Sequence, residues 1–143
     1  RAVQSSPVLW SARASLVTMV VGLGVDLVET ARVDRLLARY GDRFVHRLMD
    51  PEEAGGLPAA GPARVRGLAL AIAGKEAASK ALGTGWSRGV RWRDVVVTRA
   101  EPPTVRLRGR AAEVAQGRGS SVRTRTRLAV HGPLAIAEVW LLR

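Results

Sequence analysis

The chain has 143 residues, of which 47% are hydrophobic, and it carries a formal net charge of +11 and no cysteine. This length predicts a single globular domain, and the missing cysteine excludes disulfides, thiolate metal sites and a cysteine nucleophile. No apolar run approaches the roughly 18 residues that span a bilayer, so we expect a cytoplasmic protein with no membrane partner.

The strong positive charge indicates an acidic partner, such as a nucleic acid, an anionic lipid, an acidic protein or a phosphorylated ligand. Only 4% of the residues are aromatic, and no basic stretch has the interleaved aromatics of a base-stacking platform. Zinc-finger and basic-zipper spacings are also absent from the sequence. We therefore expect no nucleic-acid partner, and a basic nucleic-acid-binding domain is kept as an alternative.

Residues 1–18, RAVQSSPVLWSARASLVT, contain arginine and serine but no acidic residue, and Met19 follows them directly. We interpret Met19 as the natural start of one domain that covers residues 19–143. Residues 1–18 are then a poorly ordered leader or expression-derived segment, and a transit peptide is the alternative interpretation.

Residues 20–28, VVGLGVDLV, alternate with the two-residue period of a β-strand. Gly22, Gly24 and Asp26 share one face, and the other face consists of Val21, Leu23, Val25 and Leu27. Because glycines leave space beside the carboxylate, we expect a ligand or metal ion to approach the backbone near Asp26. The alternative is an aspartate at a strand end that caps the next helix.

Thr30 is a good N-cap for a helix that extends to about Leu48, and Gly41 is a candidate break or kink within it. Arginines recur every three or four residues along this helix, and a stripe of one charge sign favours an anionic partner. A solvated face is the alternative. The stripe consists of Arg32, Arg35, Arg39 and Arg43.

Residues 50–64 are rich in proline and glycine and predict a loop, after which a helix runs from about residue 65 to 82. Of the 23 basic residues only Lys75 and Lys80 are lysines. Glu76 lies on the same helical face as Lys80, and Lys75 lies about 100° away. Because lysine is a slender point charge, this choice favours a narrow slot for a phosphate or a metal-bound group; coincidence on a helix surface is the alternative.

The remainder of the chain predicts mostly β-structure, with a lone histidine, His131, in a turn between the last two strands. A histidine in such a turn is usually structural unless other site residues converge on it. The expected elements are strands at Val95–Arg99, Thr104–Arg108, 121–130 and 134–143, and a short helix at Ala111–Gln116.

The segments GLGVDLVETARV and GKEAASKALGTG together resemble the holo-acyl-carrier-protein synthases, the short trimeric class of 4′-phosphopantetheinyl transferases. That family has a G-x-D strand near its start and, further on, a helix with the motif K-E-A-x-x-K-A-[FL]-G-T-G. Asp26 and Glu76, fifty residues apart, match the family's separation, and the similarity covers nearly everything from Met19 onward. The resemblance implies an α+β fold, with an antiparallel sheet packed with helices and a trimeric assembly.

The resemblance also implies a reaction, in which the 4′-phosphopantetheine arm of coenzyme A moves to a serine of apo acyl carrier protein and adenosine 3′,5′-bisphosphate is released. Magnesium is required in the family. Carried over by motif, Asp26 and Glu76 hold the metal, Lys80 contacts phosphate, and these three are the catalytic residues. The implied coenzyme-binding residues are Lys75, Lys80, Gly83, Thr84, Gly85 and His131, and the implied carrier-protein docking residues are Arg32, Arg35 and Arg39.

Some points stay open from the sequence. Ala71 and Ile72 stand where the family usually has an arginine and an aromatic residue, so a coenzyme-binding cation would come from elsewhere, for instance Arg64 or Arg66. The catalytic base is Glu53, Glu76 or a metal-held water, and the carrier protein belongs to fatty-acid or polyketide synthesis. An inactive relative that only binds carrier protein or coenzyme A is the alternative function.

Overall fold

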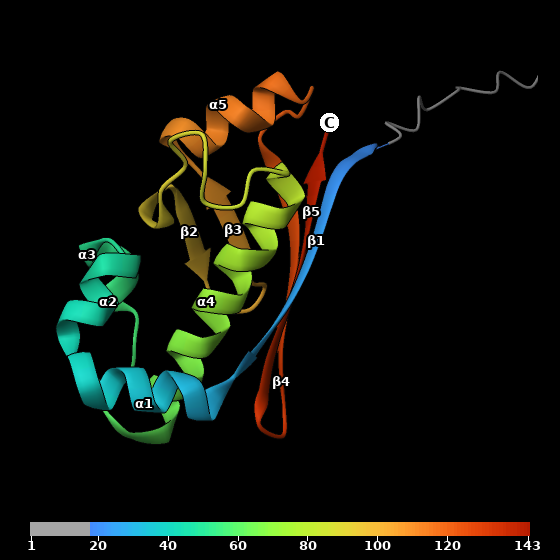
Figure 1. Cartoon of the computed structure of the whole chain (residues 1–143). Helices are drawn as coiled ribbons and strands as arrows, with labels where there is room; N and C mark the ends of the chain where they lie inside the picture. Colours follow the sequence, from blue (N-terminus) through green and yellow to red (C-terminus); the bar gives the residue numbers. More distant parts are fainter. Residues whose placement is uncertain (1–17) are drawn as a thin grey trace, which may run out of the picture.

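In the computed structural model, which describes residues 18–143, all strand pairs are antiparallel. One sheet has the strand order β1–β5–β4, and a separate sheet pairs β2 with β3 (Figure 1). This arrangement confirms the expected α+β class, whereas the interpretation of residues 1–17 lies outside the described residues. The strands are β1 Val20–Glu29, β2 Val95–Thr98, β3 Thr104–Leu107, β4 Arg123–His131 and β5 Leu134–Leu142.

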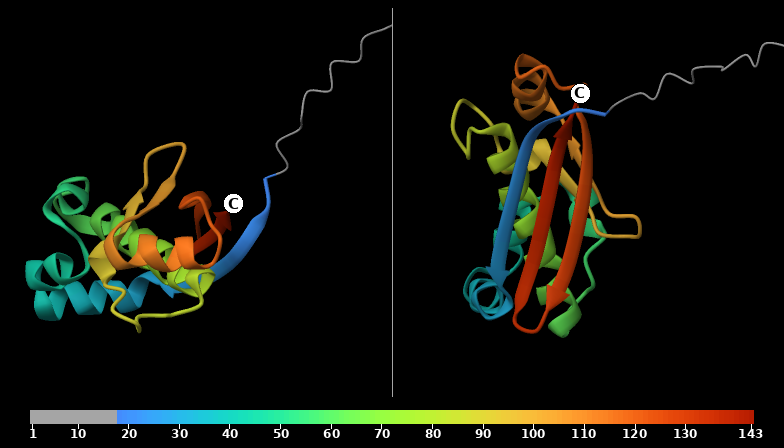
Figure 2. Two further views of the ribbon diagram at one scale, coloured as in Figure 1. Left: turned by 90° about the horizontal axis from the view of Figure 1, so that it is seen from above. Right: turned by 90° about the vertical axis from the view of Figure 1, so that its right-hand side faces the viewer.

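The long helix α4 (Gly61–Leu82) crosses one face of the three-stranded sheet, as Figures 1 and 2 show from three directions. Its close approach depends on β1, where an added Cβ at Gly24 would lie 1.8 Å from the Ala77 carbonyl oxygen and one at Gly22 would lie 2.2 Å from that of Ala81. The space over Gly22 and Gly24 is therefore filled by the backbone of α4. Our expectation that these glycines admit a ligand is wrong, because they admit a helix.

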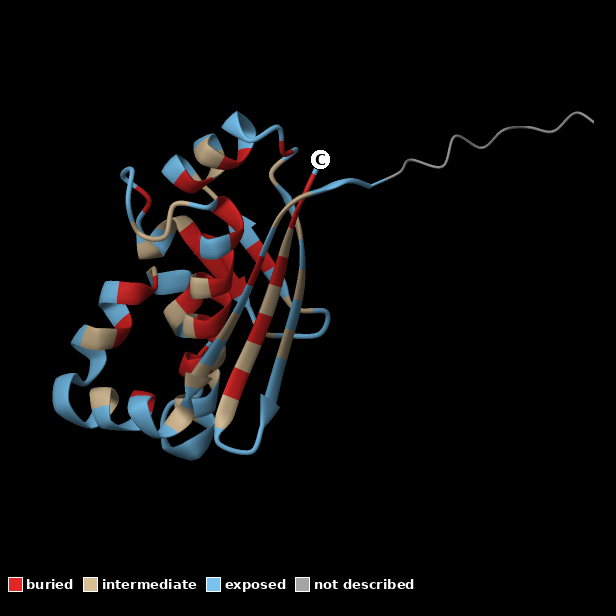
Figure 3. Cartoon of the chain, turned by 45° about the vertical axis from the view of Figure 1, so that its right-hand side comes forward, coloured by how far each residue is buried: buried red, intermediate tan, exposed pale blue. Residues whose placement is uncertain are grey.

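The opposite face of the three-stranded sheet is open. Leu23, Val25 and Leu27 of β1 are 54%, 45% and 58% exposed, although alternation alone would suggest a buried apolar face. Figure 3 shows this exposure along β1 and β4, whereas β5 alternates between buried and partly exposed residues. The core lies on the α4 side, where the buried side chains of β5 are Ala135, Ala137, Val139 and Leu141.

The helix expected after β1 is divided in two at Gly41, whose φ of 57° lies in the left-handed region that favours glycine. The two parts are α1 (Thr30–Tyr40) and α2 (Asp42–Leu48), so Arg43 belongs to α2 and not to the helix that carries Arg32. Thr30 is not the N-cap, since its hydroxyl donates to the carbonyl of Pro133 in the β4–β5 turn.

The expected loop at residues 50–64 contains a short helix, α3 (Pro51–Gly55), and the first turn of α4. Asp50 is the N-cap of α3 and accepts a hydrogen bond from the backbone N–H of Glu53 at 2.8 Å. A 3₁₀ turn, η1 (Trp92–Asp94), leads into β2, and α5 (Gly109–Gly117) follows β3. Among residues 18–143, no helix combines the length and apolar character that crossing a membrane requires.

Candidate active site

A cavity of about 580 Å³ lies where α4 meets β1, α1, α2 and η1. One part of its wall is charged, with Asp26 from β1 and Glu76 and Lys80 from α4, and the charged residues Glu29 and Arg32 line the cavity as well. Glu76 and Lys80 are one helical turn apart on α4, and Asp26 lies fifty or more positions before them in the sequence. The structure thus brings the three predicted residues together. The rest of the wall is largely apolar and includes Leu27, Leu36, Phe44, Leu48, Ile72 and Trp92.

Lys80 connects the two elements that form the charged wall. Its ammonium lies 2.8 Å from Asp26 Oδ1 and donates to the Val25 carbonyl at 3.1 Å, while its side chain remains 54% exposed. Asp26 retains its second carboxylate oxygen, and Glu76 makes no ion pair among the described residues. The carboxylates of Asp26 and Glu76 and a solvent-accessible ammonium in one cavity form a site for a metal ion and an anion together.

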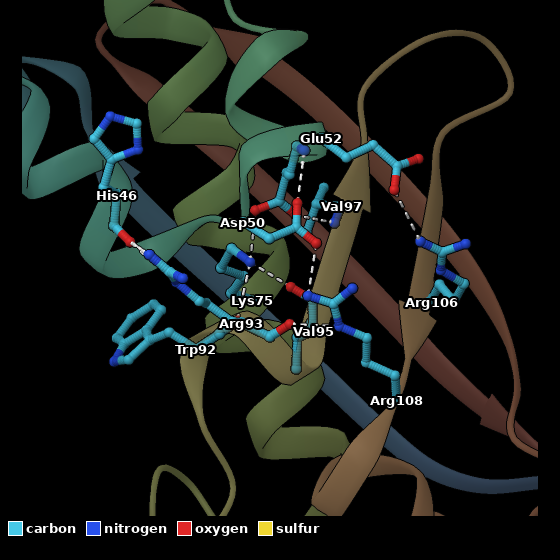
Figure 4. A network of polar contacts seen from close by, with 11 residues as sticks. His46, Asp50, Glu52, Lys75, Trp92, Arg93, Val95, Val97, Arg106 and Arg108 are labelled. Atoms are coloured by element: carbon cyan, nitrogen blue, oxygen red, sulfur yellow. Dashed lines mark hydrogen bonds and ion pairs between the residues drawn. The ribbon is translucent and has the colours of Figure 1, made fainter.

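Lys75 lies away from this cavity, because it is fully buried on another side of α4 (Figure 4). Its ammonium lies 2.7 Å from Glu53 Oε1, and it donates to the carbonyls of Trp92, at 3.0 Å, and Val95. Burial lowers the pKa of Lys75, and the Glu53 carboxylate opposes that change. The expectation that Lys75 neutralises a coenzyme phosphate is therefore wrong, since its three donors already face acceptors inside the protein.

The buried contacts around Lys75 also exclude Glu53 as the catalytic base. Its carboxylate pairs with Lys75 and accepts from the backbone N–H of Val97, and it is buried outside the residues that line the cavity. Asp50, which caps the helix that carries Glu53, also pairs with Arg108 at 2.6 Å. The hydrogen bond from the Glu53 N–H, followed by Arg108, holds the pKa of Asp50 below its usual value.

The turn Gly83–Gly85 follows the last residue of α4, Leu82, but it does not line the cavity. Gly83 adopts a left-handed φ of 78°, and its N–H donates to the Lys80 carbonyl. His131 lies exposed at the end of β4, outside the cavity as well. Within a single chain the structure does not bring these residues to Asp26 and Glu76.

A second cavity, of about 680 Å³, lies between α1, the start of α4 and the β4–β5 turn. Arg64 and Arg66 line this cavity and not the one that contains Glu76. Arg64 is also engaged, because its guanidinium lies 2.8 Å from Asp42 Oδ1 and donates to the Pro58 carbonyl. The family usually has an arginine at the position of Ala71. Neither Arg64 nor Arg66 supplies that positive charge inside the cavity that contains Glu76.

Residues 22–130 match the family model described as the 4′-phosphopantetheinyl transferase superfamily. This chain belongs to that superfamily. Among similar proteins, a holo-[acyl-carrier-protein] synthase of Alkalilimnicola ehrlichii is 47% identical over 105 residues, which are 72% of this chain and 82% of that relative. The family that the two motifs predicted is therefore confirmed.

Solved structures of phosphopantetheinyl transferases agree with the fold. The holo-[acyl-carrier-protein] synthase of Neisseria meningitidis has a TM-score of 0.74 at 31% identity, and the match covers 86% of this chain and 98% of the other. The holo-(acyl-carrier-protein) synthase of Bacillus anthracis, solved in complex with CoA (3′,5′-ADP), has a TM-score of 0.68 at 26% identity, over 87% and 97% of the two chains.

In this member of the phosphopantetheinyl transferases, arginines lead from the cavity along the outside of α1. Arg32 lines the cavity, and Arg35 and Arg39 continue from it as exposed residues on the same helix. Within residues 18–143 these three arginines form no ion pair; Arg39 instead lies 5.2 Å from the centre of the Tyr40 ring. Positive charge at the entrance of the cavity is therefore available to a partner.

A pair of tryptophans was missed by the sequence interpretation. Trp92 lines the cavity, and Trp86 stacks on it with ring centroids 3.9 Å apart and an interplanar angle of 19°. Trp86 directly follows the Gly-Thr-Gly turn that the family motif had singled out. In a chain with so few aromatic residues, two tryptophans six positions apart beside that turn were the available signal.

Proposed function

We propose that this chain transfers the 4′-phosphopantetheine group of coenzyme A to a serine of an apo acyl carrier protein. The convergence of Asp26, Glu76 and Lys80 in one cavity carries this proposal, because it joins metal-ligand and anion-binding groups in a chain of this superfamily. The relative from Alkalilimnicola ehrlichii is named for the same reaction. In the transfer, the serine oxygen forms a bond to the phosphorus of the arm, and the bond from that phosphorus to adenosine 3′,5′-bisphosphate breaks. The serine proton would pass to Glu76 or to a metal-held water, the two candidates for the base that remain.

The residues of this chain fit a magnesium ion. Among residues 18–143, no group of three or more histidine, cysteine or acidic side chains is placed to hold a metal, and magnesium usually takes one or two carboxylates together with substrate phosphates and waters. Asp26 and Glu76 would supply the two carboxylates. When bound, magnesium supplies neutralisation of the pyrophosphate charge.

Lys80 would hold a phosphate oxygen of the coenzyme beside this pair. Its exposed ammonium has three donors, of which the contacts with Asp26 and the Val25 carbonyl use two. Phosphoryl transfer depends mainly on positioning and on charge neutralisation. A fixed ammonium at this place serves both needs without acting on the serine proton.

Mass spectrometry of an apo carrier protein tests the reaction, after incubation with this chain, magnesium and coenzyme A. We expect the mass of one phosphopantetheinyl group to be added, and Asp26→Asn and Glu76→Gln each to abolish the addition while the far-ultraviolet circular dichroism spectrum stays unchanged. Glu113→Gln on the exposed surface of α5 is the matched control and should retain transfer. Binding of coenzyme A without any mass addition would instead identify an inactive relative.

The carrier protein would dock on α1 through Arg32, Arg35 and Arg39. Carrier proteins of this kind are acidic, and exposed arginines beside the cavity are complementary to an acidic helix. Arg32→Glu combined with Arg39→Glu should raise the KM for carrier protein and leave the KM for coenzyme A nearly unchanged. This effect should shrink as salt is added, and an unchanged KM for carrier protein would make the stripe a solvated face.

The active unit would be a homotrimer that associates through the open face of the sheet. Leu23, Val25 and Leu27 expose apolar surface there, and Leu27 also lines the cavity, so a neighbouring copy on this face would adjoin the site. Such a neighbour could also bring in His131, which lies apart from Asp26 within one chain. Light scattering measures the oligomeric state at the concentration of the assay. A monomer that stays fully active at high dilution would contradict the proposed homotrimer.

A further inference from the structure

Within residues 18–143, Lys75 and Glu53 are the only buried charged residues, and their contacts converge on three separate elements. Glu53 comes from α3, Lys75 from α4, and the acceptors of the ammonium include the carbonyl of Trp92 in η1. A buried ion pair is weak evidence for stability, because well-packed apolar residues of similar volume often stabilise a fold equally well. What such a pair does require is that its partners occupy defined positions.

Trp92 connects this buried network to the cavity. Its carbonyl accepts from Lys75 at 3.0 Å (Figure 4). The same residue also lines the cavity that contains Glu76. Lys75 and Glu76 are consecutive residues of α4. One helical turn therefore presents the Glu76 carboxylate to the cavity and the Lys75 ammonium to the backbone of η1, which forms another wall of the cavity through Trp92. The hydrogen bond from Lys75 to Trp92 thereby links these two walls.

Other side chains hold η1 against the elements around it. The guanidinium of Arg93 donates to the His46 carbonyl in α2, and Arg108 Nε donates to the Arg93 carbonyl at 3.0 Å. Trp86 stacks on the ring of Trp92 itself. These contacts fix η1 to α2 and to the turn after α4, whereas the Lys75 ammonium fixes it to the turn of α4 that carries Glu76.

We propose that the Glu53–Lys75 pair is a positioning pair, which holds the Trp92 wall at the distance from Glu76 that coenzyme A requires. The proposal rests on the function proposed above for this cavity. Neither residue lines the cavity, and both act through the backbone of Trp92. If the wall moves away from α4, coenzyme A loses contact area in the bound state, and its KM rises more than its kcat falls.

The test uses Glu53→Gln/Lys75→Met, which removes both charges at nearly constant volume and leaves no ammonium to hold Trp92. Acrylamide quenching of Trp92 fluorescence, isolated by subtracting the signal of a Trp92→Phe variant in each background, should increase about twofold or more. The KM for coenzyme A should rise about tenfold, in the range for partners that orient a site from outside it. Unchanged quenching and an unchanged KM in the folded variant would overturn the proposal.

Two further variants complete the design. Leu141→Val weakens the core at the end of β5, where Leu141 pairs with Gly22, and should change neither readout once it is folded. If the double variant does not fold, Lys75→Arg replaces it, since a broad guanidinium in the same slot displaces the Trp92 carbonyl and should produce the same shifts. The quenching measurement does not need turnover. A chain that fails to transfer would therefore refute the proposed function, while the quenching result would still decide whether the Glu53–Lys75 pair positions Trp92.

Discussion

Lys75 and Lys80 lie five residues apart on α4 and occupy opposite environments. The Lys75 ammonium is fully buried and faces a carboxylate and two carbonyls, whereas the Lys80 side chain is about half exposed beside a cavity. The first lysine satisfies all its donors within the fold. The second keeps capacity for an anion, although both began as the same residue type on the same helix.

This difference teaches that the closed side of α4 serves the open side. Glu76 faces the cavity and its neighbour Lys75 faces the interior, so the network around Lys75 fixes the orientation of the turn that presents Glu76. Substitutions on the closed side should then lower both stability and coenzyme affinity, whereas those on the open side should lower activity alone. The predictions below test that difference, beginning with the largest expected effect.

Lys75→Met alone should produce the largest loss of stability. It leaves the Glu53 carboxylate buried without its partner, and breaking a buried pair in this way costs about 3–5 kcal/mol. Denaturant unfolding followed by circular dichroism measures the loss. Glu53→Gln in the same chain should recover most of it, and a single variant within about 1 kcal/mol of the parent would show that Lys75 is not committed to the interior.

Lys80→Met should show the opposite profile, with activity lost and stability kept. Removing one fixed donor to a developing charge lowers kcat about 10²–10³-fold, while an exposed pair such as Lys80–Asp26 contributes only about 0–1 kcal/mol. Steady-state transfer and unfolding are measured on the same preparation. Lys80→Arg should recover part of the rate, since a guanidinium keeps the charge but not the slender shape; full recovery would contradict the argument from lysine geometry.

Gly24→Ala should affect both stability and activity, because Gly24 contacts the backbone of α4 between the buried Lys75 side and the cavity side of that helix. The new Cβ would lie 1.8 Å from the Ala77 carbonyl, so the helix must move, at a cost of about 1–3 kcal/mol. That movement also shifts Glu76 relative to Asp26, and transfer should fall with stability. Gly55→Ala, where an added Cβ meets nothing within 4 Å, is the matched control. Full activity in Gly24→Ala would mean that the site does not depend on this contact.

Asp50→Asn should give the smallest effect, and one that depends on pH. Asn preserves the cap of α3 but loses the charge paired with Arg108, for about 1 kcal/mol or less. Since the pKa of folded Asp50 lies below its ordinary 3.8, its ionisation stabilises the fold fully above that value. The difference in unfolding free energy between parent and variant should therefore vanish as the pH falls through the folded pKa. A difference that persists in acid would exclude the charge as its cause.

Much of the fold could be predicted from local patterns. The strand at residues 20–28, the helix ending at Leu82 and the later strands all agree within a few residues with the structure, because alternation and a terminal glycine encode them locally. Where tertiary contacts decide, prediction failed, since the glycine face of β1 was expected to admit a ligand and instead admits α4. The apolar side of β1 is exposed because α4 packs on the glycine side instead, and nothing within the strand itself states which face the helix will cover.

The site shows the same limit. Asp26, Glu76 and Lys80 could be placed together through a two-part motif, and the structure brings them into one cavity. Lys75 could not be separated from Lys80 by sequence, since the difference depends on Glu53, more than twenty residues earlier and in a segment expected to be a loop. The position of Trp92 likewise follows from backbone contacts with Lys75 that no side-chain pattern records.

The contact of Gly22 and Gly24 with the carbonyls of Ala77 and Ala81 has a consequence for how such a chain can change over generations. Each glycine faces main chain, which cannot be trimmed by substitution, so enlarging either glycine is not compensated by shrinking its partner. Variation here would need a shift of the whole helix, and therefore several simultaneous replacements along it. A mutational library for altered substrate range should accordingly hold these four positions fixed and diversify the cavity lining, where side chains can be exchanged one at a time.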